Sequence, residues 1–306
     1  MIALRRIHHV CLRVADLDEA VQRWSLQFGL TERDRDPERA LLACAYEPYS
    51  IELRRADQPG ADHTGYELTG DCSLDDAAAH LDGLGIAYRR EEDALHLSDP
   101  DGHGVELVPH ERGDDSRPAI ARSTATLGGF HPRKLGHINT FTGDLERTTA
   151  FYRDALGMRI ADWLEDAGAW LYVNADHHTV ALVARPPARF HHVAFELGDW
   201  GELRVALDHV AQHGRWLGWG PVRHGLGQNL AAYVRIPEEH VFVELYSDME
   251  QLEADHEPRV WPDNPHSSNV WGILPPRSFF RFDEPAVEAE RLGLEAQGHP
   301  LPPEGD

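Results

Sequence analysis

The chain has 306 residues, of which 42% are hydrophobic and 26% are charged, a composition typical of a globular protein and not of a fibrous or disordered one. Its 52 acidic and 29 basic residues give a net charge of −23, which repels phosphate backbones and anionic lipid surfaces, so neither nucleic acid nor a membrane is expected as a partner. No stretch has the continuous apolar run of a signal peptide or a membrane span, and three cysteines without CxxC spacing predict no disulfide framework. We therefore expect a cytoplasmic protein.

The sequence contains two copies of one pattern. Residues 6–30 and 134–158 each predict a short strand, an aspartate at the start of a helix, an amphipathic helix and a glycine just after it. Each copy continues with a further strand, a second helix closed by glycine, and a last strand. These later segments are 62–70, 73–85 and 104–110 in the first copy, and 191–199, 200–214 and 242–248 in the second.

The second copy has an insertion before its last strand. Residues 218–233, GWGPVRHGLGQNLAAY, have no counterpart in the first copy, and their glycines predict a loop. After the last strand, residues 249–282 are too rich in proline for a helix and too rich in aromatic residues for disorder. We expect them to form an extended tail that packs across the second copy.

Two histidines and one glutamate of the second copy lie on three different predicted strands. Alternation along each strand places His137, His192 and Glu244 on the face of the sheet away from the apolar residues. Two imidazoles and one carboxylate are the ligand set that holds non-haem Fe(II) and leaves positions open for substrate and oxygen. Only one member of the pair at 191–192 can face inward, so His191 is expected on the surface or behind His192.

The first copy has the same residue types at corresponding positions, His9, His63 and Glu106. In a chain with 20 histidines, any single one of them is more simply explained as an exposed or hydrogen-bonded side chain. The repetition of the whole triple favours metal binding over chance.

In these motifs the chain resembles the type I extradiol catechol dioxygenases of the vicinal oxygen chelate superfamily. The resemblance covers about residues 5–248, with LGHIN around His137, FHHVAF around His192 and VELY around Glu244. It implies an α+β fold of two tandem modules, each made of paired βαβββ units, with the metal in the second module. The implied organisation is a first module at 1–112, a linker at 113–131, a catalytic module at 132–250 and a tail at 251–306.

The resemblance also implies a reaction, in which both atoms of O2 enter a catecholic ring beside its vicinal hydroxyls and give a 2-hydroxymuconic-semialdehyde-type product. It implies Fe(II), or Mn(II) in the same ligands, with O2 as co-substrate, a small aromatic diol as substrate, and a homo-oligomer. Within the HHTVAL and GPVRHGLGQNLAAY motifs, His178 is expected to act as acid and base. His224 and Tyr233 are expected to donate hydrogen bonds to substrate and oxygen.

Some alternatives stay open. The turn before Glu244 is one residue longer than in the family, so this glutamate could be out of register. The resemblance implies a first module without metal, whereas the His-His-Glu triple of that module leaves a second site open. Trp271 or Phe279 of the tail either forms a lid over the substrate entrance or simply covers the surface.

Two other functions are compatible with the fold. The protein could be another metal enzyme, such as an isomerase or a thiol transferase, and activity without oxygen would favour this reading. It could instead be a binding protein without catalysis, but such a protein would have lost metal ligands, and here none is lost.

Overall fold

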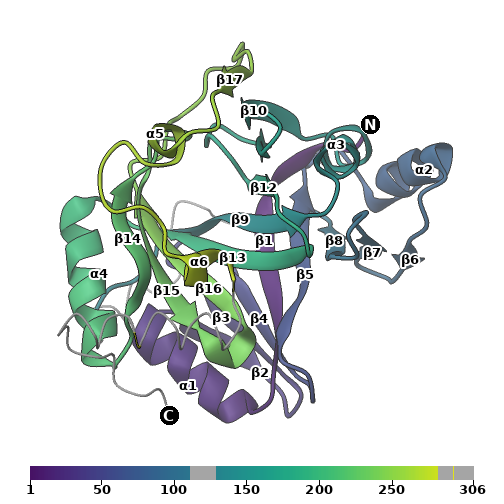
Figure 1. Ribbon diagram of the computed structural model, residues 1–306. Helices are drawn as coiled ribbons and strands as arrows, with labels where there is room; N and C mark the ends of the chain where they lie inside the picture. The colour runs from purple at the N-terminus through teal and green to yellow at the C-terminus, as the bar shows by residue number, and fades with distance from the viewer. Residues whose placement is uncertain (111–128, 282–291, 293–306) are drawn as a thin grey trace.

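A computed structural model describes residues 1–110, 129–281 and 292 (Figure 1). Within residues 1–110 the chain forms one sheet of eight strands in the order β2-β3-β4-β1-β5-β8-β7-β6. Within residues 129–281 it forms a sheet of nine strands in the order β14-β15-β16-β13-β9-β12-β11-β10-β17. The predicted α+β fold of two modules built from paired βαβββ units is confirmed. The predicted linker, apart from residues 129–131, lies outside the described residues, as does the tail beyond residue 281 except residue 292.

The two helices of the first module begin and end at the predicted signals. The side chain of Asp16 accepts a hydrogen bond from the backbone N–H of Glu19, and Gly29 ends the helix in the left-handed conformation at φ +69°. The elements of this module are β1 (Leu4–Val14), α1 (Leu17–Phe28), β2 (Thr31–Arg35), β3 (Arg39–Ala43), β4 (Ile51–Arg55), β5 (Gly60–Leu68), α2 (Leu74–Leu84), β6 (Arg89–Arg90), β7 (Leu95–Ser98) and β8 (Gly104–Val108).

The second module repeats this order with an added π-helical turn, η1, and a 3-10 turn, η2. Its first helix is capped by the side chain of Asp144, which accepts from the backbone N–H of Arg147. The elements are β9 (Lys134–Thr142), α3 (Leu145–Ala150), η1 (Phe151–Ala155), β10 (Arg159–Leu164), β11 (Gly168–Tyr172), β12 (Val180–Ala184), β13 (Arg189–Glu196), α4 (Trp200–Gln212), β14 (Leu217–Arg223), β15 (Leu230–Ile236), η2 (Pro237–Glu239) and β16 (Val241–Ser247).

The expectation of a glycine-rich loop at 218–233 is wrong, because most of this segment forms the antiparallel strands β14 and β15. The residues of β15 alternate between two apolar clusters: Ala232 joins the main core, while Tyr233 faces the other cluster. In β14 the glycines at 218 and 220 have no side chains, so the alternation cannot be seen in its sequence. A Cβ atom at Gly218 would lie 2.4 Å from the ring of Phe242, so the glycine lets that ring pack against the strand.

The two modules share one hydrophobic core. Helices α1 and α4 lie next to each other where the modules meet (Figure 1). The rings of Trp24 and Phe195 meet edge to face there, with centroids 6.4 Å apart. The guanidinium of Arg23 forms a buried ion pair with the carboxylate of Glu239 in the other module.

The tail packs on the second module, as expected. It contains β17 (Arg259–Trp261), α5 (Pro265–Ser268) and α6 (Arg277–Phe280). Strand β17 pairs in parallel with β10 and so extends the second sheet. The backbone N–H of Arg223 donates to the carbonyl oxygen of Trp271, which ties the tail to the edge of β14.

Cys11, Cys44 and Cys72, the three cysteines of the chain, form no disulfide, as predicted. Among the described residues, none of the helices has the length and apolar character needed to cross a membrane.

Candidate metal centre

Three adjacent strands bring the predicted ligands together. Ala194 of β13 lies opposite His137 of β9 on one side and opposite Glu244 of β16 on the other. His192, two residues before Ala194, points to the same face. The Nε2 atoms of His137 and His192 each lie 3.1 Å from Oε2 of Glu244, and one donor atom from each of the three residues lies within 4.8 Å of the other two. The longer turn before Glu244 therefore leaves it in register.

The charges of these side chains suit a divalent cation. Burial raises the pKa of the Glu244 carboxyl, but the facing imidazoles of His137 and His192 more than offset this and hold the pKa well below its usual range. Burial lowers the pKa of His192, which favours the neutral ring that can donate a lone pair to a metal. Two neutral imidazoles and one ionised carboxylate, buried on one side of a common point, fit Fe(II) or Mn(II).

Hydrogen bonds behind His192 fix which of its nitrogens is free. Nε2 of His191 lies 2.7 Å from the carbonyl oxygen of Phe279, which can only accept, so His191 carries its proton there. Nδ1 of neutral His191 then accepts from Nδ1 of His192 at 2.8 Å. This leaves Nε2 of His192 unprotonated and facing Glu244, as a metal ligand requires. His191 is buried, so the surface position that the sequence left open for it is wrong.

Asn229 also contacts the ligand set. Its side-chain N–H donates to Oε1 of Glu244 at 2.8 Å, which leaves Oε2 of the carboxylate for the metal. Asn229 was not predicted as a site residue, although it stands in the same motif as His224 and Tyr233.

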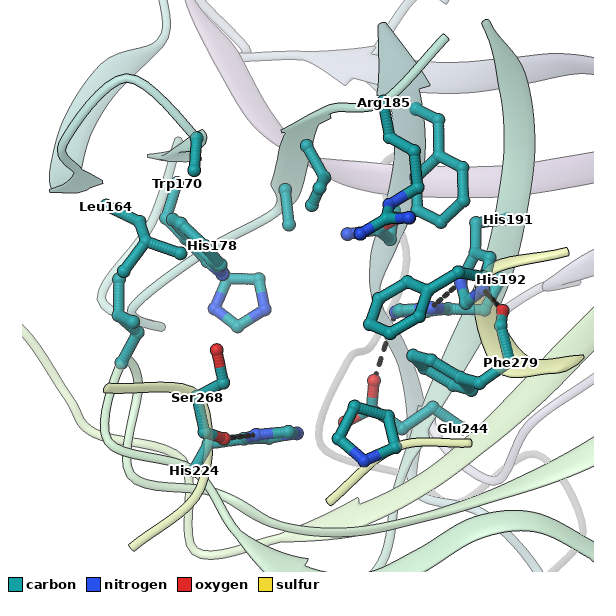
Figure 2. A pocket seen from close by; sticks show the side chains of 18 of the residues that line it. Leu164, Trp170, His178, Arg185, His191, His192, His224, Glu244, Ser268 and Phe279 are labelled. Carbon is teal, nitrogen blue, oxygen red and sulfur yellow. Dashed lines mark hydrogen bonds and ion pairs between the residues drawn. The ribbon is translucent and has the colours of Figure 1, made fainter. Parts of the chain in front are cut away.

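His178 has a similar support behind it. Its Nδ1 lies 3.1 Å from Nδ1 of His177, whose Nε2 lies 3.1 Å from Oδ2 of Asp162. Because a carboxylate only accepts, His177 donates to Asp162 and accepts from His178. Nε2 of His178 is then unprotonated, and the ring points into the open centre of the cavity (Figure 2).

The tail anchors this chain of hydrogen bonds. Arg259 and Trp261 of β17 donate to the carboxylate of Asp162 at distances of 2.7 to 2.9 Å. Burial raises the pKa of Asp162, but the hydrogen bonds from His177 and Arg259 outweigh burial and lower it to about 2. Asp162 was not predicted. Its only signal was a carboxylate between apolar residues of β10.

His224 and Tyr233 form a pair at the cavity wall. Nδ1 of His224 lies 2.6 Å from the carbonyl oxygen of Ser268 and so carries a proton, while Nε2 lies 2.7 Å from the hydroxyl of Tyr233. Burial lowers the pKa of His224, and in the neutral ring Nε2 can only accept. The tyrosine hydroxyl is therefore the donor. His224 has no N–H left for a substrate, which differs from its expected role.

These side chains surround a cavity of about 300 Å³. The cavity is lined by His137, His192 and Glu244 together with His178, His224 and Tyr233, so the structure brings all six predicted site residues to one place. Figure 2 labels four of them, His178, His192, His224 and Glu244. Of the two tail residues considered as a lid, Phe279 lines the cavity and packs against Tyr233 with centroids 4.9 Å apart. Trp271 lies outside this lining, is 48% exposed and meets Trp200.

Comparison with known proteins agrees with this geometry. Residues 134–268 match the Glyoxalase/Bleomycin resistance protein/Dioxygenase superfamily. The chain is 29% identical to metapyrocatechase 2 of Cupriavidus necator, in an alignment that covers 92% of this chain and 93% of that relative. Its fold is similar to homoprotocatechuate 2,3-dioxygenase of Arthrobacter globiformis, with a TM-score of 0.80 at 20% identity over 91% of each chain. It is also similar to the Mn(II)-bound glyoxalase of Novosphingobium aromaticivorans, with a TM-score of 0.78 at 24% identity over 91% of this chain and 94% of that one. The predicted resemblance to the extradiol dioxygenases of the vicinal oxygen chelate superfamily is thus confirmed, by a family model over residues 134–268 and by similarity to a metapyrocatechase over nearly the whole chain.

Proposed function

We propose that this protein is an extradiol ring-cleavage dioxygenase. It inserts both atoms of O2 into a catecholic ring beside the vicinal hydroxyls and gives a 2-hydroxymuconic-semialdehyde-type product. The observation that carries the proposal is the His-His-Glu set on the wall of a cavity of about 300 Å³ that holds a further imidazole and a phenol. The relative named metapyrocatechase 2, which matches nearly the whole chain, supports the same reaction.

The metal would be held by His137, His192 and Glu244. It would supply a Lewis acid for the two substrate hydroxyls and a path for electrons from the ring to O2. We propose Fe(II), because two histidines and one carboxylate with open positions are typical of non-haem Fe(II) oxygenases. Mn(II) is the alternative, since these donors do not distinguish the two ions sharply, and one protein of similar fold is described as Mn(II)-bound.

His178 is proposed as the proton acceptor and donor. The hydrogen bonds from Asp162 through His177 leave its Nε2 free toward the cavity. This nitrogen can take a proton from a substrate hydroxyl and return it later in the reaction. Asp162 and His177 orient the ring and would stabilise its charged form, which makes them positioning residues.

Tyr233 is proposed as the hydrogen-bond donor to substrate oxygen. Its hydroxyl lies at the cavity wall with His224 as its acceptor. When a substrate oxygen becomes negatively charged, the hydroxyl can turn toward it and stabilise that charge. His224 would act through Tyr233.

The shape of the cavity suggests the kind of catechol. Leu164, Trp170 and Phe279 give it apolar walls. The guanidinium of Arg185 lies 4.0 Å from the ring centroid of Phe280 at an exposed position of the lining. We propose a catechol with an apolar ring substituent, and a carboxylated ring is the alternative that Arg185 would favour.

The compartment and the assembly are also proposals. Cysteines without disulfides suit the reducing cytoplasm. The expected homo-oligomer stays a prediction, and light scattering on the purified protein would test it. The division at 1–112, 113–131, 132–250 and 251–306 also stays a prediction, because the linker lies mostly outside the described residues.

The test is oxygen uptake during turnover. The protein is purified without oxygen, loaded with Fe(II) or Mn(II), and mixed in air with catechol and with alkyl-, aryl- and carboxyl-substituted catechols. We expect one O2 consumed per yellow ring-opened product formed. Product formation without oxygen would indicate the isomerase or thiol transferase. Binding of catechols without turnover, at full metal loading, would indicate the binding protein.

A further inference from the structure

The first module places its own His-His-Glu triple in the register of the metal centre. Gly65 of β5 lies opposite His9 of β1 and opposite Glu106 of β8, and His63 precedes Gly65 by two residues. The four residues therefore have the same positions in the two ladders, a correspondence that sequence spacing alone could only suggest. The corresponding residues of the second module are Ala194, His137, Glu244 and His192.

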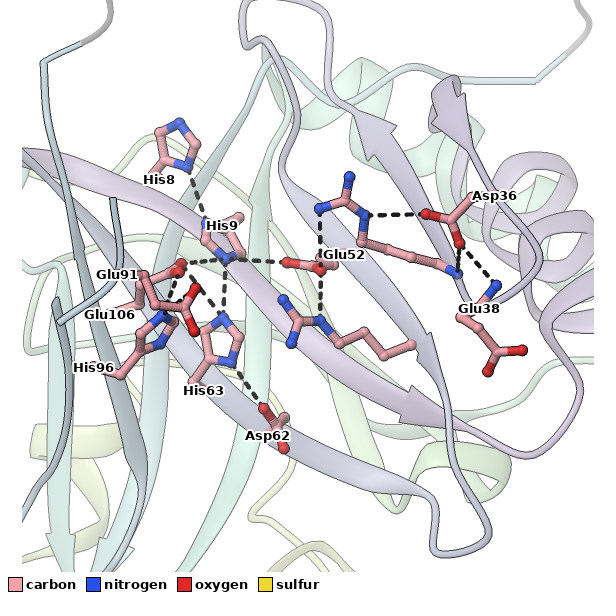
Figure 3. Close-up of polar contacts among 12 residues, drawn as sticks. His8, His9, Asp36, Glu38, Glu52, Asp62, His63, Glu91, His96 and Glu106 are labelled. Carbon is pink, nitrogen blue, oxygen red and sulfur yellow. Dashed lines mark hydrogen bonds and ion pairs between the residues drawn. The ribbon is translucent and has the colours of Figure 1, made fainter. Parts of the chain in front are cut away.

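The donor atoms of this triple converge (Figure 3). Nε2 of His9 lies 3.1 Å from Oε2 of Glu106 and 3.2 Å from Nε2 of His63. Nε2 of His63 lies 3.5 Å from the same oxygen of Glu106. Ligands about 2.05 Å from a tetrahedral zinc ion are separated from one another by about 3.3 Å, so the three separations suit one tetrahedral ion.

Glu52 of β4 brings a further carboxylate next to His9. Its Oε2 lies 3.6 Å from Nε2 of His9, and it belongs to the cluster with His9 and His63 whose donor atoms lie within 4.8 Å of one another. The Nε–H of Arg54 donates to the other oxygen, Oε1, at 2.6 Å, which leaves Oε2 for the cluster. Glu52 lies opposite Cys11 in the ladder, as Ala181 lies opposite Asn139 in the second module.

Contacts outside the cluster orient its histidines. Oδ2 of Asp62 lies 2.8 Å from Nδ1 of His63 and accepts its proton, so Nε2 is the nitrogen that faces the cluster. A carboxylate behind an imidazole is the usual support of a histidine ligand. Nδ1 of His9 lies 2.9 Å from Nδ1 of His8, which repeats the histidine pair of the second module. A Cβ atom at Gly65 would lie 2.3 Å from the ring of His9, so this position needs glycine.

The burial of the two carboxylates also suits a cation. Glu52 and Glu106 are both buried, with exposed fractions of 3% and 8%. Two buried carboxylates cost free energy unless positive charge lies beside them. Arg54 lies beside Glu52, and a divalent ion between the two imidazoles would bring positive charge to both carboxylates.

We propose that the first module holds a second metal ion, a structural Zn²⁺ bound by His9, His63, Glu106 and Glu52. Four protein ligands close the coordination of zinc, so the site binds neither substrate nor oxygen. The ion links β1, β4, β5 and β8, four neighbouring strands of the first sheet. The proposal revises the expectation, drawn from family resemblance, of a first module without metal, and it does not rest on the proposed function.

The experiment counts metal ions per chain by plasma mass spectrometry on the full chain, purified with zinc and iron and then dialysed. We expect about two ions in the wild type, and about one in His192→Ala, in which only the first module binds. Glu106→Gln, which keeps the side-chain volume, should also contain about one, and the double variant close to none. His110→Ala, in the same module but outside the cluster, should match the wild type. Absence of metal from His192→Ala, or wild-type content in Glu106→Gln, would overturn the proposal.

Cobalt substitution gives a test that needs no change in the first module. His192→Ala loaded with Co²⁺ should show the intense visible absorption of a tetrahedral ion, and the addition of Glu106→Gln should abolish it. Weak absorption would contradict four-coordinate binding. Circular dichroism confirms that each variant is folded. If the wild type does not oxidise catechols while His192→Ala still binds one ion, the proposed function fails and the structural site stands.

Discussion

The two modules carry the same ligand triple in the same register but differ in the residue beside it. In the second module this neighbour is Ala181, which lines the cavity. In the first module it is Glu52, whose carboxylate reaches the cluster. The triple therefore determines where a metal can bind, and the neighbouring side chain determines whether a substrate can reach it.

The hydrogen-bonding groups around the two triples also differ. Tyr233 lies opposite Glu244 in the second module, and His96 lies opposite Glu106 in the first. The carbonyl oxygen of Ser50 accepts from the backbone N–H of Val10 in β1, as that of Thr179 accepts from Ile138 in β9. Tyr49, just before Ser50, therefore has the position of His178, just before Thr179. A phenol has no basic nitrogen, so the first module lacks the imidazole that we propose as the general base of the second. This difference separates a catalytic centre from a structural one, and it can be tested from either side.

The largest effect is expected for His192→Ala. Loss of one of three ligands should remove the metal from the second module and lower turnover below about 0.1% of the wild type. The measurement is oxygen uptake with the best catechol, with His110→Ala as the control. Turnover close to that of the wild type would mean that the second module does not carry the reaction.

Ala181→Glu gives the second module a carboxylate at the position that Glu52 has in the first module. The new side chain should occupy a position meant for substrate, so turnover should fall below about 1% while the metal is retained. Metal content and oxygen uptake are measured together, and Ala181→Ser is the control of similar size to alanine. If Ala181→Glu binds metal and turns over normally, the neighbouring residue does not explain the difference between the modules.

Tyr233→Phe removes one hydroxyl from the cavity. We expect kcat to fall about 10- to 100-fold, because the oxygen that becomes charged loses its donor, with unchanged metal content. Tyr172→Phe, at a buried tyrosine outside the cavity lining, is the matched control. A raised KM with normal kcat would assign Tyr233 to binding alone.

Much of this comparison could be predicted from the sequence. Alternation along single strands is a local signal, so the faces of His137, His192 and Glu244 followed from short segments. Glu52 could not be identified in this way, because its approach to His9 depends on the pairing of β4 with β1. Asp162 could not be identified either, because Arg259 of β17 reaches it through the pairing of β17 with β10, and the two residues are 97 positions apart in the chain.

Asp162→Asn tests the series of hydrogen bonds through His177 that orients His178, the proposed base of the second module. An amide can donate to His177 and so reverse the proton positions, which would leave Nε2 of His178 protonated. We expect kcat to fall about tenfold and the acid side of the pH profile to move, with unchanged metal content. An unchanged pH profile would limit Asp162 to a structural role.

The same substitution should have a smaller effect on stability at low pH. The pKa of the Asp162 carboxyl is about 2 in the folded protein against an ordinary value of 3.8. A lowered pKa means that the ionised carboxylate stabilises the fold above about pH 4, and that this contribution is lost as the pH falls toward 2. It amounts to roughly 2 kcal/mol in the free energy of unfolding. In urea unfolding, the difference between wild type and Asp162→Asn should therefore be largest above pH 4 and shrink as the pH is lowered. A difference that does not depend on pH would mean that Asp162 stabilises β10 and β17 by packing and neutral hydrogen bonds, so that its charge is not what holds the tail to the second module.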